Sequence, residues 1–172
     1  MKKIVSLLLL TLSIMLLNGC VPKENINIKT YTDPKANLAG YKTYDWLVGA
    51  NILVDNKKQW VGRGYDINHY VEMQITDQLL AKGKNRNLHT PDFLISYVVG
   101  VNMDSMKEKT DENGIKYFKN IPEGGIGIVL LDTRTKQVIW ASNADATVQS
   151  KLAVEDSKKR IAYAIEQMFT RF

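Results

Sequence analysis

Two segments with the period of an amphipathic helix constrain the fold of this chain more than any other feature. In the first segment the apolar positions recur every four residues: Ile67, Val71, Ile75 and Leu79. Asp66 is placed to cap the start of this helix, and Gly83 supplies a left-handed stop. In the second segment, from around Leu152, the apolar positions are Ile161, Ala164, Ile165, Met168 and Phe169. Each helix therefore has an apolar face that must cover another apolar surface.

The other apolar runs predict strands that supply this surface. Ile26, Ile28 and Thr30 alternate with polar residues, the two-residue period of a half-buried strand. Further strands are expected at 42–47, 93–101, 125–131 and 137–148. The run from Phe93 to Val101 is almost continuously apolar and β-branched, which predicts a central strand buried on both faces or nearly so. The last two strands are separated by a short turn and form the best hairpin candidate.

These elements give the order strand, strand, helix, three strands, helix. The pattern predicts an α+β fold: a mostly antiparallel sheet with both helices packed on one face. Residues 49–64 are expected to form a loop. The polar segment 102–124 leaves two alternatives open, a hairpin using residues 115–118 or a mobile loop.

The N-terminal segment has the pattern of a bacterial lipoprotein signal. Lys2 and Lys3 precede the uncharged apolar run 4–17, which is short for a membrane span, and Gly19 stands directly before Cys20. This predicts a signal peptide at 1–19, a lipidated tether at 20–25 and a single α+β domain at 26–172. An ordinary secretory signal followed by a free thiol is the alternative, but an unpaired exposed cysteine is a liability in an oxidising compartment.

Lipidation of Cys20 has consequences for the rest of the chain, because it is the only cysteine. The domain then has no disulfide and must be held together by packing. The whole chain has 23 Lys and Arg against 18 Asp and Glu; without Lys2 and Lys3 the balance is 21 against 18, or +3. A net charge this small gives no indication that the protein binds nucleic acid. Val21, where an aspartate would favour inner-membrane retention, indicates the outer membrane and its periplasmic side.

No pattern for catalysis, a metal or a cofactor stands out in the remaining chain. The two histidines, His69 and His89, have no acidic or cysteine partner at metal-ligand spacing, and no serine lies in a nucleophile elbow. Asp92 and Asp132 stand at strand ends, where a carboxylate pair is an alternative to simple turn capping. The glycine-rich run 124–127 leads into a strand, whereas a phosphate cradle needs a helix after its glycines.

The segment 102–124 is the candidate binding region, because it is the longest stretch without an apolar period and recognition tends to reside in loops on a rigid scaffold. It combines basic and aromatic residues: Lys107, Lys109, Lys116, Tyr117, Phe118 and Lys119. These could meet lipid headgroups, a polyanionic glycan or an envelope protein; a merely solvated segment is the alternative.

Several blocks resemble one family of bacterial lipoproteins. The most specific is Gly40-Tyr41-Lys42-Thr43-Tyr44-Asp45-Trp46, and others are Pro91-Asp92-Phe93-Leu94-Ile95 and Lys136-Gln137-Val138-Ile139-Trp140. Together they resemble the domain of unknown function 4136 over nearly the whole mature chain. Lys84 departs from the pattern, where an aromatic residue is more common. The resemblance implies a fold and a cell-envelope location but no activity.

The aromatic residues of that block, Tyr41, Tyr44 and Trp46, have two interpretations. They pack the end of the sheet or its seam with a helix, or they form a shelf for a glycan or peptide. Packing is the simpler reading.

Two classes of function follow from the sequence. The first is a non-catalytic, lipid-anchored envelope lipoprotein that serves as a binding or assembly module. The second is an envelope hydrolase whose Asp, His and Ser residues converge in the fold. A histidine hydrogen-bonded to both a carboxylate and a hydroxyl inside a cleft would favour the second class.

Overall fold

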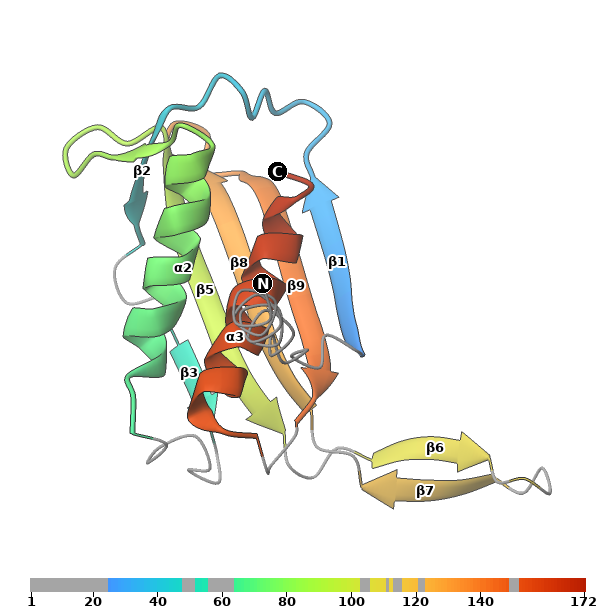
Figure 1. Ribbon diagram of the computed structural model, residues 1–172. Helices are drawn as coiled ribbons and strands as arrows, with labels where there is room; N and C mark the ends of the chain where they lie inside the picture. The colour runs from blue at the N-terminus through green and yellow to red at the C-terminus, as the bar shows by residue number, and fades with distance from the viewer. Residues whose placement is uncertain are drawn as a thin grey trace, which may run out of the picture.

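A computed structural model of the chain describes residues 25–47, 52–55, 64–102, 106–110, 112, 116–120, 123–148 and 152–172. In these ranges, helices α2 (Ile67–Ala81) and α3 (Val154–Phe169) lie side by side over one face of a seven-stranded sheet (Figure 1). The strands are β1 (Ile26–Thr32), β2 (Thr43–Trp46), β3 (Ile52–Asp55), β4 (Asn85–Arg86), β5 (Phe93–Asn102), β8 (Glu123–Asp132) and β9 (Val138–Thr147). A separate hairpin consists of β6 (Met106–Thr110) and β7 (Lys116–Asn120).

The sheet is mixed, with an antiparallel and a parallel part. Its strand order is β1-β9-β8-β5-β2-β4, and the neighbours from β1 to β5 pair antiparallel. On the other side of β5, both β2 and β3 pair with it in parallel, and β4 pairs in parallel with β2. Parallel neighbours need a crossover connection, and α2 provides it between β3 and β5.

The α+β fold with both helices on one face is therefore confirmed, and a mostly antiparallel sheet is roughly right. The predicted order of strand, strand, helix, three strands, helix is wrong. It leaves out β3, β4 and the hairpin strands β6 and β7. β4 has only two residues, which is too short for a two-residue period to stand out in the sequence. β3 has four residues and lies inside the segment 49–64, whose many polar residues predicted a loop.

The predicted signals at the ends of α2 are confirmed. The Asp66 carboxylate accepts hydrogen bonds from the backbone N–H groups of Asn68 and His69, at 2.9 and 3.2 Å. Gly83 has a φ of 70°, and the Lys84 N–H after it donates to the Leu79 carbonyl at 2.9 Å. These contacts satisfy backbone groups that the helix itself leaves without partners.

The core lies between the helices and the sheet. The six helix positions expected to face the sheet are all buried: Val71, Ile75, Leu79, Ile161, Ile165 and Phe169. They belong to one cluster with the buried residues of the strands. Trp140 of β9 is fully buried, and its ring centroid lies 5.2 Å from that of Phe169.

The prediction that β5 is buried on both faces is wrong. Its residues alternate, with Phe93, Ile95 and Tyr97 buried toward the helices, whereas Val98 on the opposite face is 42% exposed. An apolar run is expected for a strand covered on both sides, but here both helices lie on the same side.

A register irregularity in β9 also changes which residues share a face. The pairing of β8 with β9 shifts between Leu130 and Leu131. Ile139 and Trp140 are consequently both buried, although they are neighbours in a strand, and Val138 is exposed. Such bulges place two residues opposite one and break the simple alternation.

The signal peptide, Cys20 and all of the tether except Asn25 lie outside the described residues, so these remain predictions. Within the described ranges, neither helix is long and apolar enough to span a membrane.

Candidate binding site at the hairpin end of the sheet

The two ends of the sheet differ in character. At one end, the loop before β2, the start of β5 and the turn after β8 are joined by polar contacts. At the other end, called here the hairpin end, the register brings together the start of β1, the end of β5, the start of β8 and the end of β9. The sequence-predicted residues are divided between these ends.

Asp92 and Asp132 act as caps at the first end. One Asp92 oxygen accepts hydrogen bonds from the backbone N–H groups of Lys42 and Thr43, both at 2.8 Å. Asp132 accepts from the N–H groups of Arg134 and Thr135, at 2.8 and 2.6 Å. The turn-capping interpretation is confirmed for both, because each carboxylate is engaged by the backbone of a loop.

Tyr41 adds a charge-assisted hydrogen bond to this network. Its hydroxyl donates to the Asp132 carboxylate at 2.6 Å. This bond is the main reason that the pKa of Asp132 is lowered to about 2, and it also raises the pKa of Tyr41 to about 12. The arrangement holds the loop before β2 against the turn after β8.

Of the other aromatic residues of the block, Tyr44 lies in the core and Trp46 is partly buried and packs against it, as the simpler reading predicted. Tyr44 is 1% exposed and stacks on Phe93 with ring centroids 6.0 Å apart. Trp46 meets the edge of Tyr97 at the same distance. Rings engaged in this way are not a shelf for a ligand.

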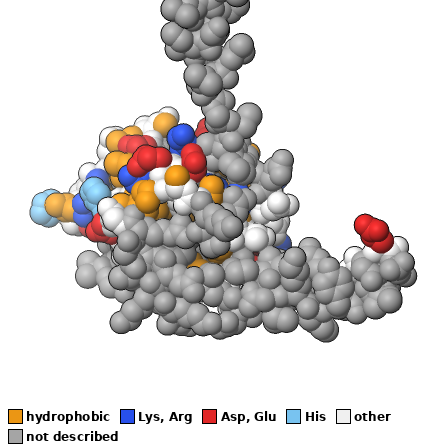
Figure 2. Space-filling view, turned by 60° about the horizontal axis from the view of Figure 1, so that its bottom comes forward, with side chains coloured by type: hydrophobic (Ala, Val, Ile, Leu, Met, Phe, Trp, Pro, Cys, Tyr) orange, Lys and Arg blue, Asp and Glu red, His pale blue; other side chains and the backbone are white. Residues whose placement is uncertain are grey.

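The histidines do not converge with other reactive groups. Both His69 and His89 are exposed, and Figure 2 shows histidine side chains at the outer surface. Across the described ranges, neither imidazole hydrogen-bonds to a carboxylate or a hydroxyl, and no three His, Cys, Asp or Glu side chains gather as metal ligands do. The geometry that would favour a hydrolase is not found in this part of the chain.

The glycine-rich run 124–127 lies within β8, paired antiparallel with β5 and β9. The strand reading is confirmed. Gly124 and Gly125 have a second consequence, since both line a cavity at the hairpin end.

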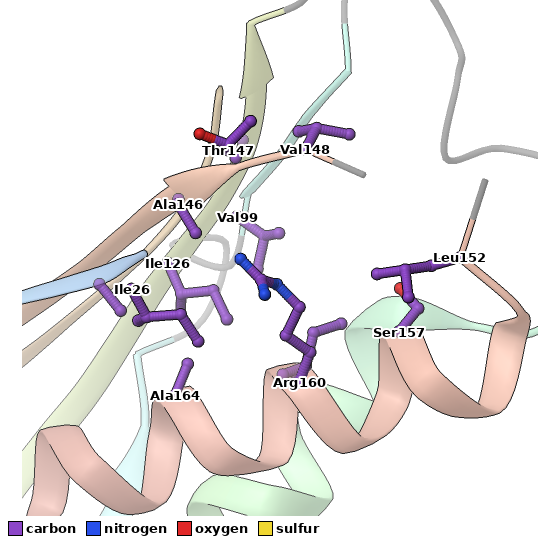
Figure 3. A pocket seen from close by; sticks show the side chains of 15 residues that line it. Ile26, Val99, Ile126, Ala146, Thr147, Val148, Leu152, Ser157, Arg160 and Ala164 are labelled. Carbon is purple, nitrogen blue, oxygen red and sulfur yellow. The ribbon is translucent and has the colours of Figure 1, made fainter. Parts of the chain in front are cut away.

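This cavity lies between the first turns of α3 and the sheet (Figure 3). Its volume is about 90 Å³. The sheet contributes Val99 of β5, Ile126 of β8 and Ala146 of β9, and Ile26 at the start of β1 closes one side. The walls are therefore mainly aliphatic.

Arg160 points from α3 into this aliphatic space (Figure 3). The residue is 8% exposed, and burial lowers the pKa of its guanidinium. Ser157, Ile161 and Ala164 lie on the same side of the helix as Arg160, because they follow its three- and four-residue spacing. A cation inside the apolar stripe of α3 is the sequence signal that could have indicated the cavity.

The predicted binding residues fall on the hairpin that continues β5 and β8 outward. Figure 1 shows β6 and β7 standing away from the body of the domain at this end. The register places Lys107 opposite Lys119 and Lys109 opposite Tyr117. The remaining two, Phe118 and Lys116, pair with Glu108 and Thr110. The hairpin alternative for this segment is confirmed at the level of the backbone, and a role of these residues in binding stays a prediction.

Comparison with protein families matches residues 28–172 to a model described as domain of unknown function DUF4136. The chain belongs to this family. The predicted resemblance is thus confirmed. No curated protein matches the chain.

Solved structures share the fold of this DUF4136 chain. A PelC dodecamer from Paraburkholderia phytofirmans is 15% identical with a TM-score of 0.52, and the match covers 84% of this chain and 95% of that one. A DUF4136 protein from Bacteroides thetaiotaomicron is 14% identical with a TM-score of 0.52, covering 86% and 96% of the two chains. A PDZ domain protein from Parabacteroides distasonis has the same identity and TM-score, but only 37% of its length is matched. The TM-scores show a common fold.

Proposed function

We propose that this DUF4136 chain is a non-catalytic lipoprotein of the bacterial cell envelope. It is anchored by lipid on Cys20, faces the periplasm, most simply from the outer membrane, and serves as a binding or assembly module. The hairpin β6–β7 is its docking element, and an envelope protein is its partner.

The observation that carries this proposal is the position of the hairpin. The start of β1 pairs with the end of β9, at Ile26 and Ala146, and the end of β5 pairs with the start of β8, at Asn102 and Glu123. The chain therefore leaves the predicted tether and enters the hairpin at the same end of the sheet. An element displayed beside the anchor is suited to contact other proteins at the membrane surface.

The form of the hairpin supports a role in docking. A two-stranded hairpin is at best marginally stable alone in water, because it has no third strand or helix to bury a face. Figure 1 shows this one away from both helices. Binding a partner would supply the missing packing. The PelC structure of the same fold is a dodecamer, which agrees with an assembly role for such a domain.

The enzyme alternative has less support. Asp92 and Asp132 are engaged in caps, and in the described ranges the two histidines are exposed and neither imidazole hydrogen-bonds to a carboxylate or a hydroxyl. A hydrolase needs such groups within hydrogen-bond reach of one another. We therefore favour binding over catalysis.

Site-specific photo-crosslinking in intact cells tests the docking element. A photoreactive amino acid replaces Tyr117 in the hairpin; the control carries it at Tyr31, which is 54% exposed on β1. We expect a discrete crosslinked species at position 117 that is absent at position 31. The double substitution of Lys107→Glu and Lys119→Glu should reduce this species, whereas Lys35→Glu with Lys159→Glu should not. Crosslinks of equal yield at both positions, or none at position 117, would contradict the proposal.

A further inference from the structure

The cavity beneath α3 has the chemistry of a ligand site. We propose that it binds a free fatty acid, whose carboxylate pairs with Arg160 and whose first methylenes lie between α3 and strands β8 and β9. This inference rests on the proposed function only in taking the membrane to be nearby.

The lining selects an aliphatic ligand. Among the described residues that form it, the side chains are Ile, Val, Leu, Ala, Ser, Thr and Arg, with glycine, and no aromatic ring is included. A sugar or a nucleobase would find no ring to stack on and few side-chain groups to satisfy its many polar atoms. Methylene groups lose water favourably in such surroundings.

The guanidinium selects an anionic end group. Arginine presents several N–H donors in a planar fork that matches a carboxylate with two parallel hydrogen bonds. Ser157 of α3 also belongs to the lining, and its hydroxyl is a donor of the kind a carboxylate accepts. Because the surroundings are apolar, a carboxylate brought to Arg160 forms a stronger pair than it would in water.

The size of the cavity limits how much of the ligand enters. Its volume of about 90 Å³ is smaller than the roughly 150 Å³ that holds a benzene molecule in an engineered protein. The carboxylate and the first few methylenes fit, and the rest of the chain extends outward. Ile26, which lines one wall, lies six positions after Cys20. At about 3.3–3.6 Å per extended residue, the predicted lipid anchor stays within about 22 Å of the cavity wall.

Photolabelling with a diazirine derivative of palmitic acid tests the proposal. The protein is used as the cell produces it, in nanodiscs of phosphatidylethanolamine and phosphatidylglycerol, and labelled peptides are identified by mass spectrometry. We expect labelling within residues 138–148 and 152–164, competition by excess oleate, and little labelling by the methyl ester of the probe. If Cys20 is not lipidated, the protein is recovered in the soluble fraction and the same labelling is measured in buffer.

Variants separate the site from general membrane contact. Arg160→Gln should reduce the labelling of these peptides about tenfold, as expected for the loss of a charge-assisted hydrogen bond. Lys159→Gln is the matched control, since Lys159 is the adjacent cation and its side chain is 59% exposed; its labelling should equal that of the wild type. Ala146→Ile narrows the cavity without changing Arg160, and it should also reduce the labelling of these peptides. If circular dichroism shows that Arg160→Gln does not fold, the Ala146→Ile variant alone tests whether the cavity binds the probe.

Three results would overturn the proposal. The first is equal labelling of the wild-type protein and the folded cavity variants. The second is equal labelling by the acid and its ester, which would mean contact with bilayer chains only. The third is competition by added phospholipid as strong as that by oleate, which would assign the cavity to a membrane lipid.

Discussion

Tyr41 and Asp132 show how one hydrogen bond joins two distant parts of the chain. We expect Tyr41→Phe to lower the free energy of unfolding by about 1–3 kcal/mol at neutral pH, because a hydrogen bond to a buried carboxylate is lost. Urea unfolding of the variant and of Tyr31→Phe, an exposed control, measures this. An equal effect of both substitutions would argue against the bond.

The same bond gives a pH dependence of known sign. The folded-state pKa of Asp132 is about 2, below its ordinary value of 3.8. Its stabilisation is therefore complete above a pH of about 4 and is lost as the pH falls toward 2. The pKa of Tyr41 is raised to about 12 from 10.0, so its contribution is complete below pH 10 and is lost as the pH rises through 12. The difference between Tyr41→Phe and the wild type should thus shrink at both extremes.

Lys84 is the buried cation at the same end of the sheet. It is 5% exposed, and its ammonium donates to the carbonyls of Leu38 and Tyr41 at 2.9 and 2.7 Å. It also lies 5.6 Å from the ring centroid of Phe172. Lys84→Met should lower the free energy of unfolding by about 1–3 kcal/mol, because two backbone carbonyls lose their hydrogen-bond donor. Lys82→Met, at an exposed position, should stay within about 0.5 kcal/mol in the same denaturation assay.

At the scale of elements, substitutions in α2 test how this helix packs on the sheet. Leu79 is fully buried, and its neighbour Leu80 is 51% exposed. We expect Leu79→Ala to lower the free energy of unfolding by about 2–5 kcal/mol through lost transfer energy and a cavity. Leu80→Ala should change it by about 0.5 kcal/mol or less. Similar losses in both variants, measured by denaturant titration, would reject this orientation of α2.

The sequence predicted the elements whose signals are local. The four-residue spacing in α2, its Asp66 cap and its Gly83 stop all lie within one segment, and the structure confirms them. β4 was missed because two residues carry no period. The parallel pairing of β2 with β5 depends on a crossover through α2, which no single segment encodes.

The candidate site was less accessible to sequence reasoning. The cavity is assembled from four strands, α3 and the connection before it, so its small residues and its arginine are far apart in the chain. Only the position of Arg160 in the apolar stripe of α3 was a local clue. The proposed binding role of Lys107, Tyr117 and their neighbours depends on a partner, and a partner leaves no pattern in one chain.

For the molecule as a whole, the hairpin end brings the start of β1, the base of the β6–β7 hairpin and the Arg160 cavity to one side of a single domain. The opposite end is fixed by the polar contacts of Asp92 and Asp132. With the β6–β7 hairpin beside the predicted anchor, a domain whose described residues bring together no catalytic group would act by binding.

The proposed role of the hairpin in docking at the membrane depends on attachment of the chain through Cys20. The most direct test is the mass of the N-terminal peptide from the mature protein, with membrane fractionation of the wild type and Cys20→Ala. We expect the mature chain to begin at Cys20 with the added mass of a lipid and to sediment with membranes. Cys20→Ala should give unprocessed precursor or soluble protein. A mature protein with a free thiol at Cys20, or a normally processed Cys20→Ala chain that still sediments with membranes, would contradict the lipoprotein assignment.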